Sequence, residues 1–355
     1  MTLRRTAFPF LILFLLLTFT ARAGVVNPDI SVIGQMRTFM TDDPADSNRN
    51  RIQMSLDETE AEFDAALNPF AHGTVILSVL DGGIDVEEAY LQIPHSLPLG
   101  LALKAGKYRV GFGKLNPAHP HTYPFIDRFR VLAAYLPGEE SFDETGVQLS
   151  YRLPMPGDLS STLSGDLLQG STFHPQEASL SRPAWLGRWE NFFMLGDESS
   201  MEMGLSATQG VNDVALDAKT SIFGADAKAK LWLTPLNVLV LQAEGLLLDK
   251  GFATLDSATG AVSRTTLLPF GGYAFADYTW KKKYDAGVKY ERFQRPVAGK
   301  PWDQSIGLFA GFGLMEETTL FRFAWDRFFP GGAKSYNTYT VQILFSMGPH
   351  KAHQF

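Results

Sequence analysis

Short segments in which apolar and polar residues alternate constrain the fold more than any other feature of this sequence. In 223–233 the odd positions are apolar, and the even positions include Asp226, Lys228 and Lys230. The same period of two recurs in 143–153, 319–327 and 336–347. A period of two places successive side chains on opposite faces of a strand. The sequence therefore predicts β-strands with one apolar and one polar face.

The connections between these segments alternate between short turns and longer loops. The turns are expected near 68–69, 94–98, 154–158, 196–199, 234–237, 281–285 and 315–317, and the loops near 41–49, 82–85, 113–142, 171–183, 210–219, 251–266, 296–303 and 330–335. This rhythm is typical of outer-membrane barrels. We therefore expect an all-β fold, a transmembrane antiparallel β-barrel of about 16 strands with short periplasmic turns and longer extracellular loops. A periplasmic β-rich protein is the alternative, because a sandwich alternates too.

The N-terminus has the three parts of a secretory signal peptide. Arg4 and Arg5 precede an apolar stretch over 7–20, and residues 21–23 read Ala-Arg-Ala, a small-residue cleavage site. We expect residues 1–23 to be removed, which takes three arginines from a chain whose formal net charge is −7. Residues 24–355 then form a single barrel domain, which we expect in the cell outer membrane.

Several short motifs suggest a family. They are G-K-Y-R over 106–109, G-K-L-N-P over 113–117, His119, His121, P-F-I-D-R over 124–128, E-N-F-F over 190–193 and the ending over 348–355. Together they resemble a group of Gram-negative outer-membrane porin-like proteins, distant relatives of phosphate-selective porins, some labelled zinc-regulated outer-membrane receptor. The chain lacks the plug domain of a TonB-dependent receptor, so nothing visible supports that label. The alternation stops at Met347, so Phe355 would reach the barrel-assembly machinery on a short tail.

The third long loop, 113–142, is the first candidate for function, because loops of this length are usually functional or disordered. Its apolar residues allow it to pack. By analogy with general porins, we expect it to fold into the lumen as a constriction, and a surface loop over the barrel mouth is the alternative. The candidate residues of this constriction loop are His119, His121, Tyr123, Asp127, Arg128 and Arg130.

The second predicted strand carries a run of alternating carboxylates. The candidate acidic pore-lining residues are Glu58, Glu60, Glu62 and Asp64, joined by Glu88 from the fourth strand. This assignment places Asp57 on the outward face, at the membrane edge. A short solvated helix is the alternative for this segment, because Glu and Ala favour helix.

Basic residues on other predicted strands are candidates for the opposite wall. They are Lys104, Lys107, Arg109, Arg152, Lys228, Lys230, Lys289 and Arg322. Lys107 and Arg109 share the parity of apolar Leu101 and Leu103, so a bulge near Gly106 is needed to bring both inward. Facing walls of opposite charge would orient water and dipolar solutes between them.

Other chemistry is weakly indicated or excluded. His119 and His121, with a nearby carboxylate, are a weak candidate for metal binding, and His350 and His353 in the tail would bind metal only loosely. The absence of Cys excludes disulfides and thiolate sites. There is no G-x-S-x-G, H-E-x-x-H or P-loop spacing, so we expect neither an enzyme nor a cofactor. The acidic balance argues against a nucleic-acid partner.

These patterns predict an outer-membrane channel for passive diffusion of small hydrophilic solutes or ions, surrounded by outer-membrane lipid. The sign of its ion preference stays open. Two alternatives belong to other classes, a metal-responsive receptor that captures zinc with the loop histidines and a non-conducting structural or adhesive barrel. Porins are often trimers, so a homo-trimer is expected by resemblance, although no stretch of the sequence marks a trimer face.

Overall fold

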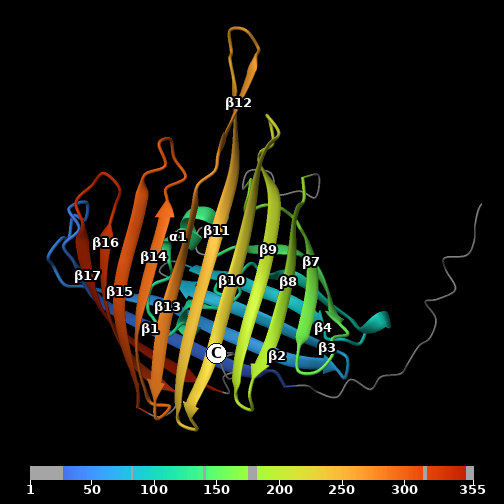
Figure 1. The fold of residues 1–355 in the computed structure, drawn as a ribbon, viewed down its shortest axis with the longest axis vertical. Coiled ribbons are helices and arrows are strands. Elements are labelled where there is room, and N and C mark those ends of the chain that lie inside the picture. Colours follow the sequence, from blue (N-terminus) through green and yellow to red (C-terminus); the bar gives the residue numbers. More distant parts are fainter. Residues whose placement is uncertain (1–26, 81–82, 139–140, 175–181, 315–317, 349–355) are drawn as a thin grey trace, which may run out of the picture.

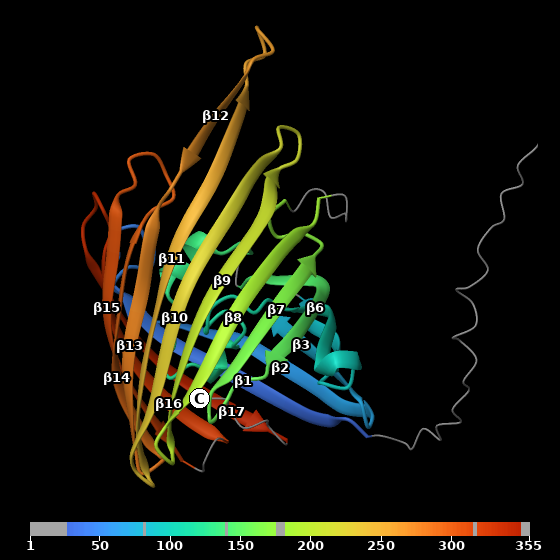
Figure 2. The same ribbon diagram turned by 45° about the vertical axis from the view of Figure 1, so that its right-hand side comes forward.

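The alternating segments form strands that pair antiparallel in chain order, as seen in a computed structural model (Figures 1 and 2). The structure describes residues 27–80, 83–138, 141–174, 182–314 and 318–348. The strands are β1 (Asp29–Thr41), β2 (Gln53–Asn68), β3 (Ala71–Leu80), β4 (Gly83–Ile93), β5 (Leu101–Arg109), β6 (Asp143–Leu153), β7 (Ser160–Leu168), β8 (Ala184–Leu195), β9 (Ser199–Asp213), β10 (Ala218–Thr234), β11 (Asn237–Leu255), β12 (Val262–Leu267), β13 (Phe270–Trp280), β14 (Tyr284–Gln294), β15 (Trp302–Gly313), β16 (Thr319–Phe329) and β17 (Tyr336–Met347). The short helices are η1 (Pro98–Gly100), η2 (Pro120–Thr122) and α1 (Arg130–Tyr135).

The sheet closes into a barrel because its first and last strands pair. β1 and β17 run in register from Val32 opposite Met347 to Thr41 opposite Thr338. Both β12 and β13 pair with β11, so they are two parts of one barrel strand. With β12 and β13 counted as one, the described chain forms a closed barrel of 16 strands, and the predicted fold class is confirmed.

Short turns lie at one end of the barrel and most longer loops at the other (Figure 1). The described turns fall where they were expected, and the predicted turn at 315–317 lies outside the described residues. The predicted loop at 251–266 is largely wrong, because β11 continues to Leu255 and β12 begins at Val262. This hairpin extends beyond the rest of the barrel (Figure 1).

The alternation separates an apolar outer face from a polar inner face. On β6, Val147, Leu149 and Tyr151 are exposed, as the outward residues of a membrane barrel are. Inward positions carry buried polar groups such as Gln342 and Arg322. The helical alternative for the acidic segment is excluded, because 53–68 is the strand β2. No helix among the described residues is both long and apolar enough to cross a membrane.

Two bulges crowd carboxylates onto the inner face. On β1 and β2, Gly34 pairs with Thr59 and Met36 pairs with Leu56. Only one residue of β1 lies between these two pairs, but two residues of β2 do, Asp57 and Glu58. One of these two is the extra residue of a bulge. Asp57 consequently lies inside and accepts a hydrogen bond from Arg37 Nε at 2.7 Å. The predicted outward placement of Asp57 is therefore wrong, because a one-residue insertion reverses the face on one side of a bulge.

A second bulge, on β4, has the same effect. Ile76 opposes Glu88 while Leu77 opposes Val86, so Glu87 is the inserted residue. Glu87 and Glu88 are both buried. Two successive carboxylates therefore lie on the inner face, whereas strict alternation would turn one of them outward.

The connection from β5 to β6 folds inside the barrel and forms its apolar core. Phe125 is fully buried, and its ring meets Phe275 on β13 at 5.1 Å and Phe309 on β15 at 5.8 Å between centroids. Phe129 stacks on Tyr273 at 4.1 Å, and α1 packs against β13 and β14. The loop lies in the lumen, as its apolar residues and its position predicted, because these partners are inward residues of the barrel wall.

Candidate functional site

A buried side-chain amide, that of Asn116, crosses the base of the inserted loop. Asn116 Nδ2 donates to the carbonyl oxygens of Val110 and Phe142 at 2.8 and 2.9 Å. Asn116 Oδ1 accepts from the Phe142 amide and from Arg128. All four hydrogen-bonding positions of the side chain are used. Asn116 thus ties the start of the loop to its end.

Two cavities of the described lumen lie beside the loop. The larger has a volume of about 690 Å³ and lies between the loop and inward residues of β1 to β11 and β13. The smaller, about 310 Å³, lies between the loop and β14 to β17. Tyr123, His119 and His121 face the larger cavity, whereas Asp127, Arg128 and Arg130 line the smaller one. The six candidate loop residues therefore separate into two groups.

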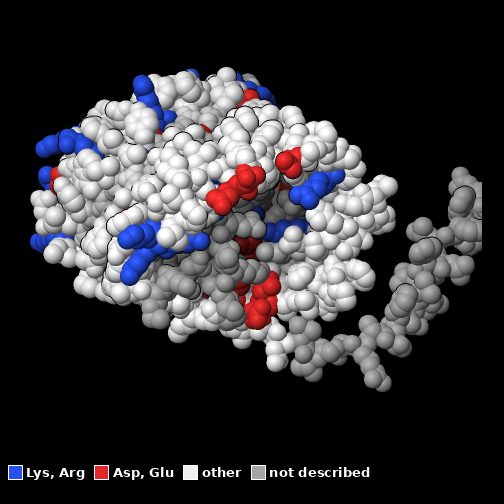
Figure 3. All heavy atoms as spheres, turned by 60° about the horizontal axis from the view of Figure 1, so that its bottom comes forward, with Lys and Arg blue, Asp and Glu red and all other residues white. Residues whose placement is uncertain are grey.

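Charges of both signs line the larger cavity. Its acidic residues are Glu60, Glu62, Glu88, Glu190, Glu202 and Asp277, and its basic residues are Lys104, Arg109, Lys114, Arg188 and Lys228. Seen from the end with the short turns, Figure 3 shows acidic and basic side chains inside a central hollow. The expected separation into facing acidic and basic walls is not found here, because Lys104 lies 3.8 Å from Glu88 and Arg109 pairs with Glu87.

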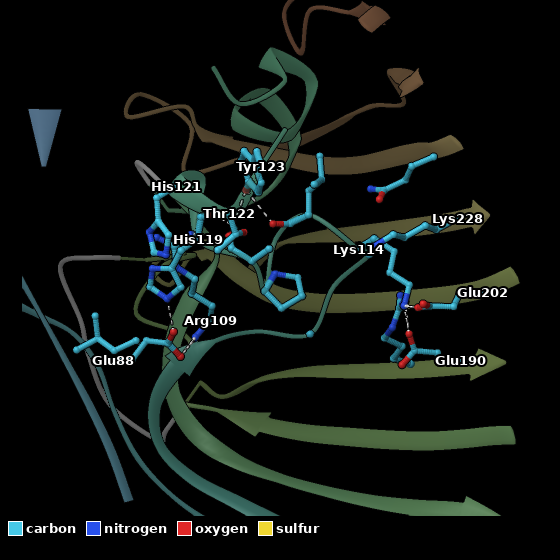
Figure 4. Close-up of a pocket in the computed structure, with 18 of the residues that line it drawn as sticks. Glu88, Arg109, Lys114, His119, His121, Thr122, Tyr123, Glu190, Glu202 and Lys228 are labelled. Atoms are coloured by element: carbon cyan, nitrogen blue, oxygen red, sulfur yellow. Dashed lines mark hydrogen bonds and ion pairs between the residues drawn. The ribbon is translucent and has the colours of Figure 1, made fainter. Parts of the chain in front are cut away.

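Lys114 connects the loop to the β8–β9 wall. Its amine reaches between Glu190 and Glu202 and forms ion pairs with both (Figure 4). Burial opposes protonation, but the two carboxylates outweigh it and raise the pKa of Lys114 above its ordinary value. The amine therefore remains a cation at neutral pH. Glycine is needed just before it, because Gly113 has φ +62° and a Cβ there would run into Glu244.

The two loop histidines contact carboxylates of β2 and β4, and Figure 4 shows His119 turned toward Glu88. His119 Nε2 lies 2.7 Å from Glu88 Oε1, and His121 Nδ1 lies 3.0 Å from Glu60 Oε1. Burial and the nearby Arg109 oppose protonation of His119, but Glu60 and Glu88 prevail and raise its pKa to about 10. Glu60, His119 and His121 also lie close enough together to hold a metal ion.

Ion pairs lie beside Asp127 and Lys289, two residues that line the smaller cavity. Arg37 on β1 reaches Asp127 at 2.8 Å and Asp57 at 2.7 Å. Lys289 Nζ lies 3.0 Å from Asp326 and 5.4 Å from the centre of the Phe125 ring. These contacts tie the loop to β1 through Arg37 and to β14 through Lys289.

The remaining predicted acidic residues lie on the wall beside the larger cavity. Glu58 accepts a hydrogen bond from Ser78 Oγ at 2.5 Å, and Asp64 accepts one from Thr74 Oγ1 at 2.7 Å. Neither belongs to the cavity lining, which takes Glu60, Glu62 and Glu88 from this set.

The predicted basic residues spread more widely. Arg322 donates to the carbonyl oxygen of His121 at 2.8 Å and so supports the loop, and Lys230 lies over the Trp232 ring. Arg152 is exposed near a turn, with its Nε 3.0 Å from Ser160 Oγ. Lys107 differs from expectation, because its amine lies 3.3 Å from Asp143 and not in the cavity. Gly106 has φ +136°, yet only Arg109 of the two turns inward.

Sequence reasoning missed several lining residues. Arg188, Glu190 and Glu202 could have been found from alternation, because exposed Trp185, Trp189 and Met203 mark the opposite faces of β8 and β9. Glu87 carries no such signal, since its inward orientation depends on the bulge. Lys114 lies in a loop, where periodicity indicates nothing about orientation.

The barrel is closed and has 16 strands, a loop folds inside it, and a charged cavity lies beside that loop. These features together define a porin-type barrel. Solved structures agree. The anion-selective porin from Comamonas acidovorans has a TM-score of 0.62 and 11% identity, covering 91% of this chain and 100% of that one. OprB of Pseudomonas putida has a TM-score of 0.57 and 10% identity, covering 91% and 94%. The trimer form of OmpT, an outer membrane protein of Vibrio cholerae, has a TM-score of 0.56 and 11% identity, covering 90% and 100%.

The fold of this chain is therefore that of Gram-negative outer-membrane porins. Sequence comparison adds a relative without an assigned role. A protein of Aquifex aeolicus (strain VF5), described as uncharacterized, is 25% identical over 338 residues, covering 85% of this chain and 70% of that protein. No protein-family model matches the chain.

Proposed function

We propose that this protein is an outer-membrane channel through which small hydrophilic solutes diffuse passively along the larger cavity. The observation that carries this proposal is the charged cavity of about 690 Å³ that remains beside the inserted loop. Polar groups on the inner face can replace part of the hydration of a passing solute. Such a channel needs no cofactor and no catalytic residue.

The lining residues support a preference for dipolar solutes over ions of one sign. Six acidic and five basic residues line the cavity, and they are interleaved. Because the charges that line this cavity nearly balance, we expect the protein to discriminate weakly between cations and anions. The local fields between neighbouring opposite charges are strong at close range, so a zwitterionic solute is oriented as it passes.

The surroundings of the barrel belong to the same proposal. The exposed apolar residues on outward strand positions fit contact with outer-membrane lipid. Export through a signal peptide and recognition of the C-terminal segment by the barrel-assembly machinery concern residues 1–23 and 349–355, which lie outside the described residues. A homo-trimer is proposed from the trimer form of the Vibrio cholerae OmpT structure.

The test is single-channel recording of the refolded mature chain in a planar bilayer, followed by the reversal potential in a tenfold KCl gradient. We expect discrete current steps and a reversal potential close to zero. A heat-modifiable, β-rich barrel that inserts and never conducts would contradict the channel and favour a plugged structural barrel. A reversal potential near the Nernst limit of either ion would contradict the balanced lumen.

A further inference from the structure

Two histidines of the inserted loop turn their nitrogen atoms toward one glutamate of the barrel wall. His119 Nδ1 lies 3.0 Å from Glu60 Oε2, and His121 Nδ1 lies 3.0 Å from Glu60 Oε1. The ligand atoms of the three residues all lie within 4.8 Å of one another. Each imidazole thus approaches a different oxygen of the same carboxylate, as groups that share a small cation can.

The surroundings are unusually rich in carboxylates for a buried place. Glu60 is 3% exposed, and it forms a second close group with Glu58 and Glu87. Glu88 approaches His119 from the other side, at Nε2. Neighbouring buried carboxylates repel one another unless cations lie among them. Arg109 pairs with Glu87, and Lys104 lies 3.8 Å from Glu88. The bulge on β4 adds to this density, because it turns Glu87 and Glu88 inward together.

Glu87 and His119 each carry an atom here that lacks a hydrogen bond within the described part of the chain. Glu87 is 9% exposed, and its Oε2 is buried without a hydrogen-bond partner. His119 Nδ1 is likewise unpaired by hydrogen-bond geometry, although Glu60 is close. A buried polar atom without a partner costs free energy. A cation bound between His119 and Glu60 would satisfy His119 Nδ1.

We propose that Glu60, His119 and His121 bind a divalent transition-metal ion of the zinc type at the wall of the larger cavity. Two imidazoles and one carboxylate are a donor set that zinc accepts, with a fourth position left for water or solute. Glu88 accepts the hydrogen bond of the remaining His119 nitrogen and fixes the orientation of the ring. All three proposed ligands line the passage, so the bound ion restricts it.

The test is calorimetric titration of the refolded mature chain in detergent with zinc chloride. Every protein carries His350→Gln and His353→Gln and no polyhistidine tag, so that the tail cannot bind metal. We expect one zinc per chain. Glu60→Gln and His121→Gln, which keep size and neutral hydrogen bonding, should each weaken binding at least about tenfold. His95→Asn is the matched control, because His95 lies exposed in a short turn with φ 51°, which Asn tolerates.

Folding and function are read separately from binding. Heat-modifiable mobility in gels shows whether each variant forms the barrel, and the visible absorption of bound Co²⁺ reports nitrogen and oxygen coordination without any current. The site would be overturned if the parent bound no zinc, or if Glu60→Gln and His121→Gln bound zinc as tightly as the parent. The restriction of the passage rests on the proposed channel, so zinc should lower the current of the parent and not of Glu60→Gln. Binding without a change in current would leave the site standing and contradict passage through the larger cavity, whereas a protein that binds zinc and never conducts would contradict the proposed channel itself.

Discussion

The inserted loop has two faces that contact the barrel in different ways. Its apolar face packs Phe125 and Phe129 against aromatic rings of β13 and β15. Its polar face presents Lys114 and His119 to carboxylates across the larger cavity. Apolar burial is non-directional and insensitive to ionic conditions, whereas charge pairs depend on salt and on their partners. The difference suggests that one face holds the loop in place and the other determines what passes.

The largest effect is expected from removing the apolar contact. Truncation of a buried Phe to Ala costs about 3–5 kcal/mol, and Phe125 is fully buried. Phe125→Ala combined with Phe129→Ala should detach the loop, lower the thermal unfolding temperature and raise single-channel conductance. Both are measured on the refolded protein, by tryptophan fluorescence on heating and in planar bilayers.

Phe223→Ala is the matched control, because Phe223 is 47% exposed on the outer face of β10 and does not touch the loop. It should leave conductance unchanged. If the double variant also conducts like the parent, the apolar face does not position the loop.

The next effect concerns the polar face. Lys114→Gln removes the cation between Glu190 and Glu202 and makes the cavity more acidic by one charge. We expect the reversal potential in a KCl gradient to move toward cation preference while the barrel stays folded. Lys334→Gln, at an exposed loop position, changes the net charge equally and should not shift it. An equal shift in both variants would mean that total charge governs selectivity.

A smaller effect is expected from the ion pairs on the side of the smaller cavity. Arg37→Met removes the contacts to Asp57 and Asp127. These side chains are partly exposed, so the loss in stability should be about 1 kcal/mol or less, seen as a slight drop in unfolding temperature. Arg327→Met, on the outer face of β16, is the control. A loss comparable to that of the Phe125 and Phe129 double variant would show that charge pairs, too, hold the loop.

The smallest effect is expected from pH, which should leave the influence of Lys114 on the reversal potential unchanged near neutrality. The carboxylates raise the pKa of Lys114, and a group raised in the folded state contributes stability that is complete below its unfolded pKa. That contribution is lost only as the pH rises through the pKa of Lys114 in the folded protein, which lies above the ordinary lysine pKa of about 10.4. The difference in reversal potential between the parent and Lys114→Gln should therefore stay constant from pH 6 to about pH 9. A difference that vanishes within this range would show that Lys114 is not held as a cation.

The fold was more readable from the sequence than the site. Alternation marks the strands and their outward residues, because every barrel strand must present apolar side chains to one face. The placement of Asp57 failed, and Glu87 was missed, because a bulge is set by the pairing of two strands and leaves no mark in one strand's periodicity. The partners of Lys114 come from β8 and β9, far along the chain, and only the closed barrel brings them to the loop.

The central claim is that solutes pass through the larger cavity beside the loop. The chain has no cysteine, so each of two variants can carry a single one. Glu62→Cys places it in the lining of that cavity, and Val147→Cys places it on the outer face of the barrel. The measurement is single-channel current before and after a water-soluble, charged thiol reagent is added. We predict a stepwise fall in current for Glu62→Cys and none for Val147→Cys. A conducting Glu62→Cys channel whose current is unchanged by complete modification would contradict the account.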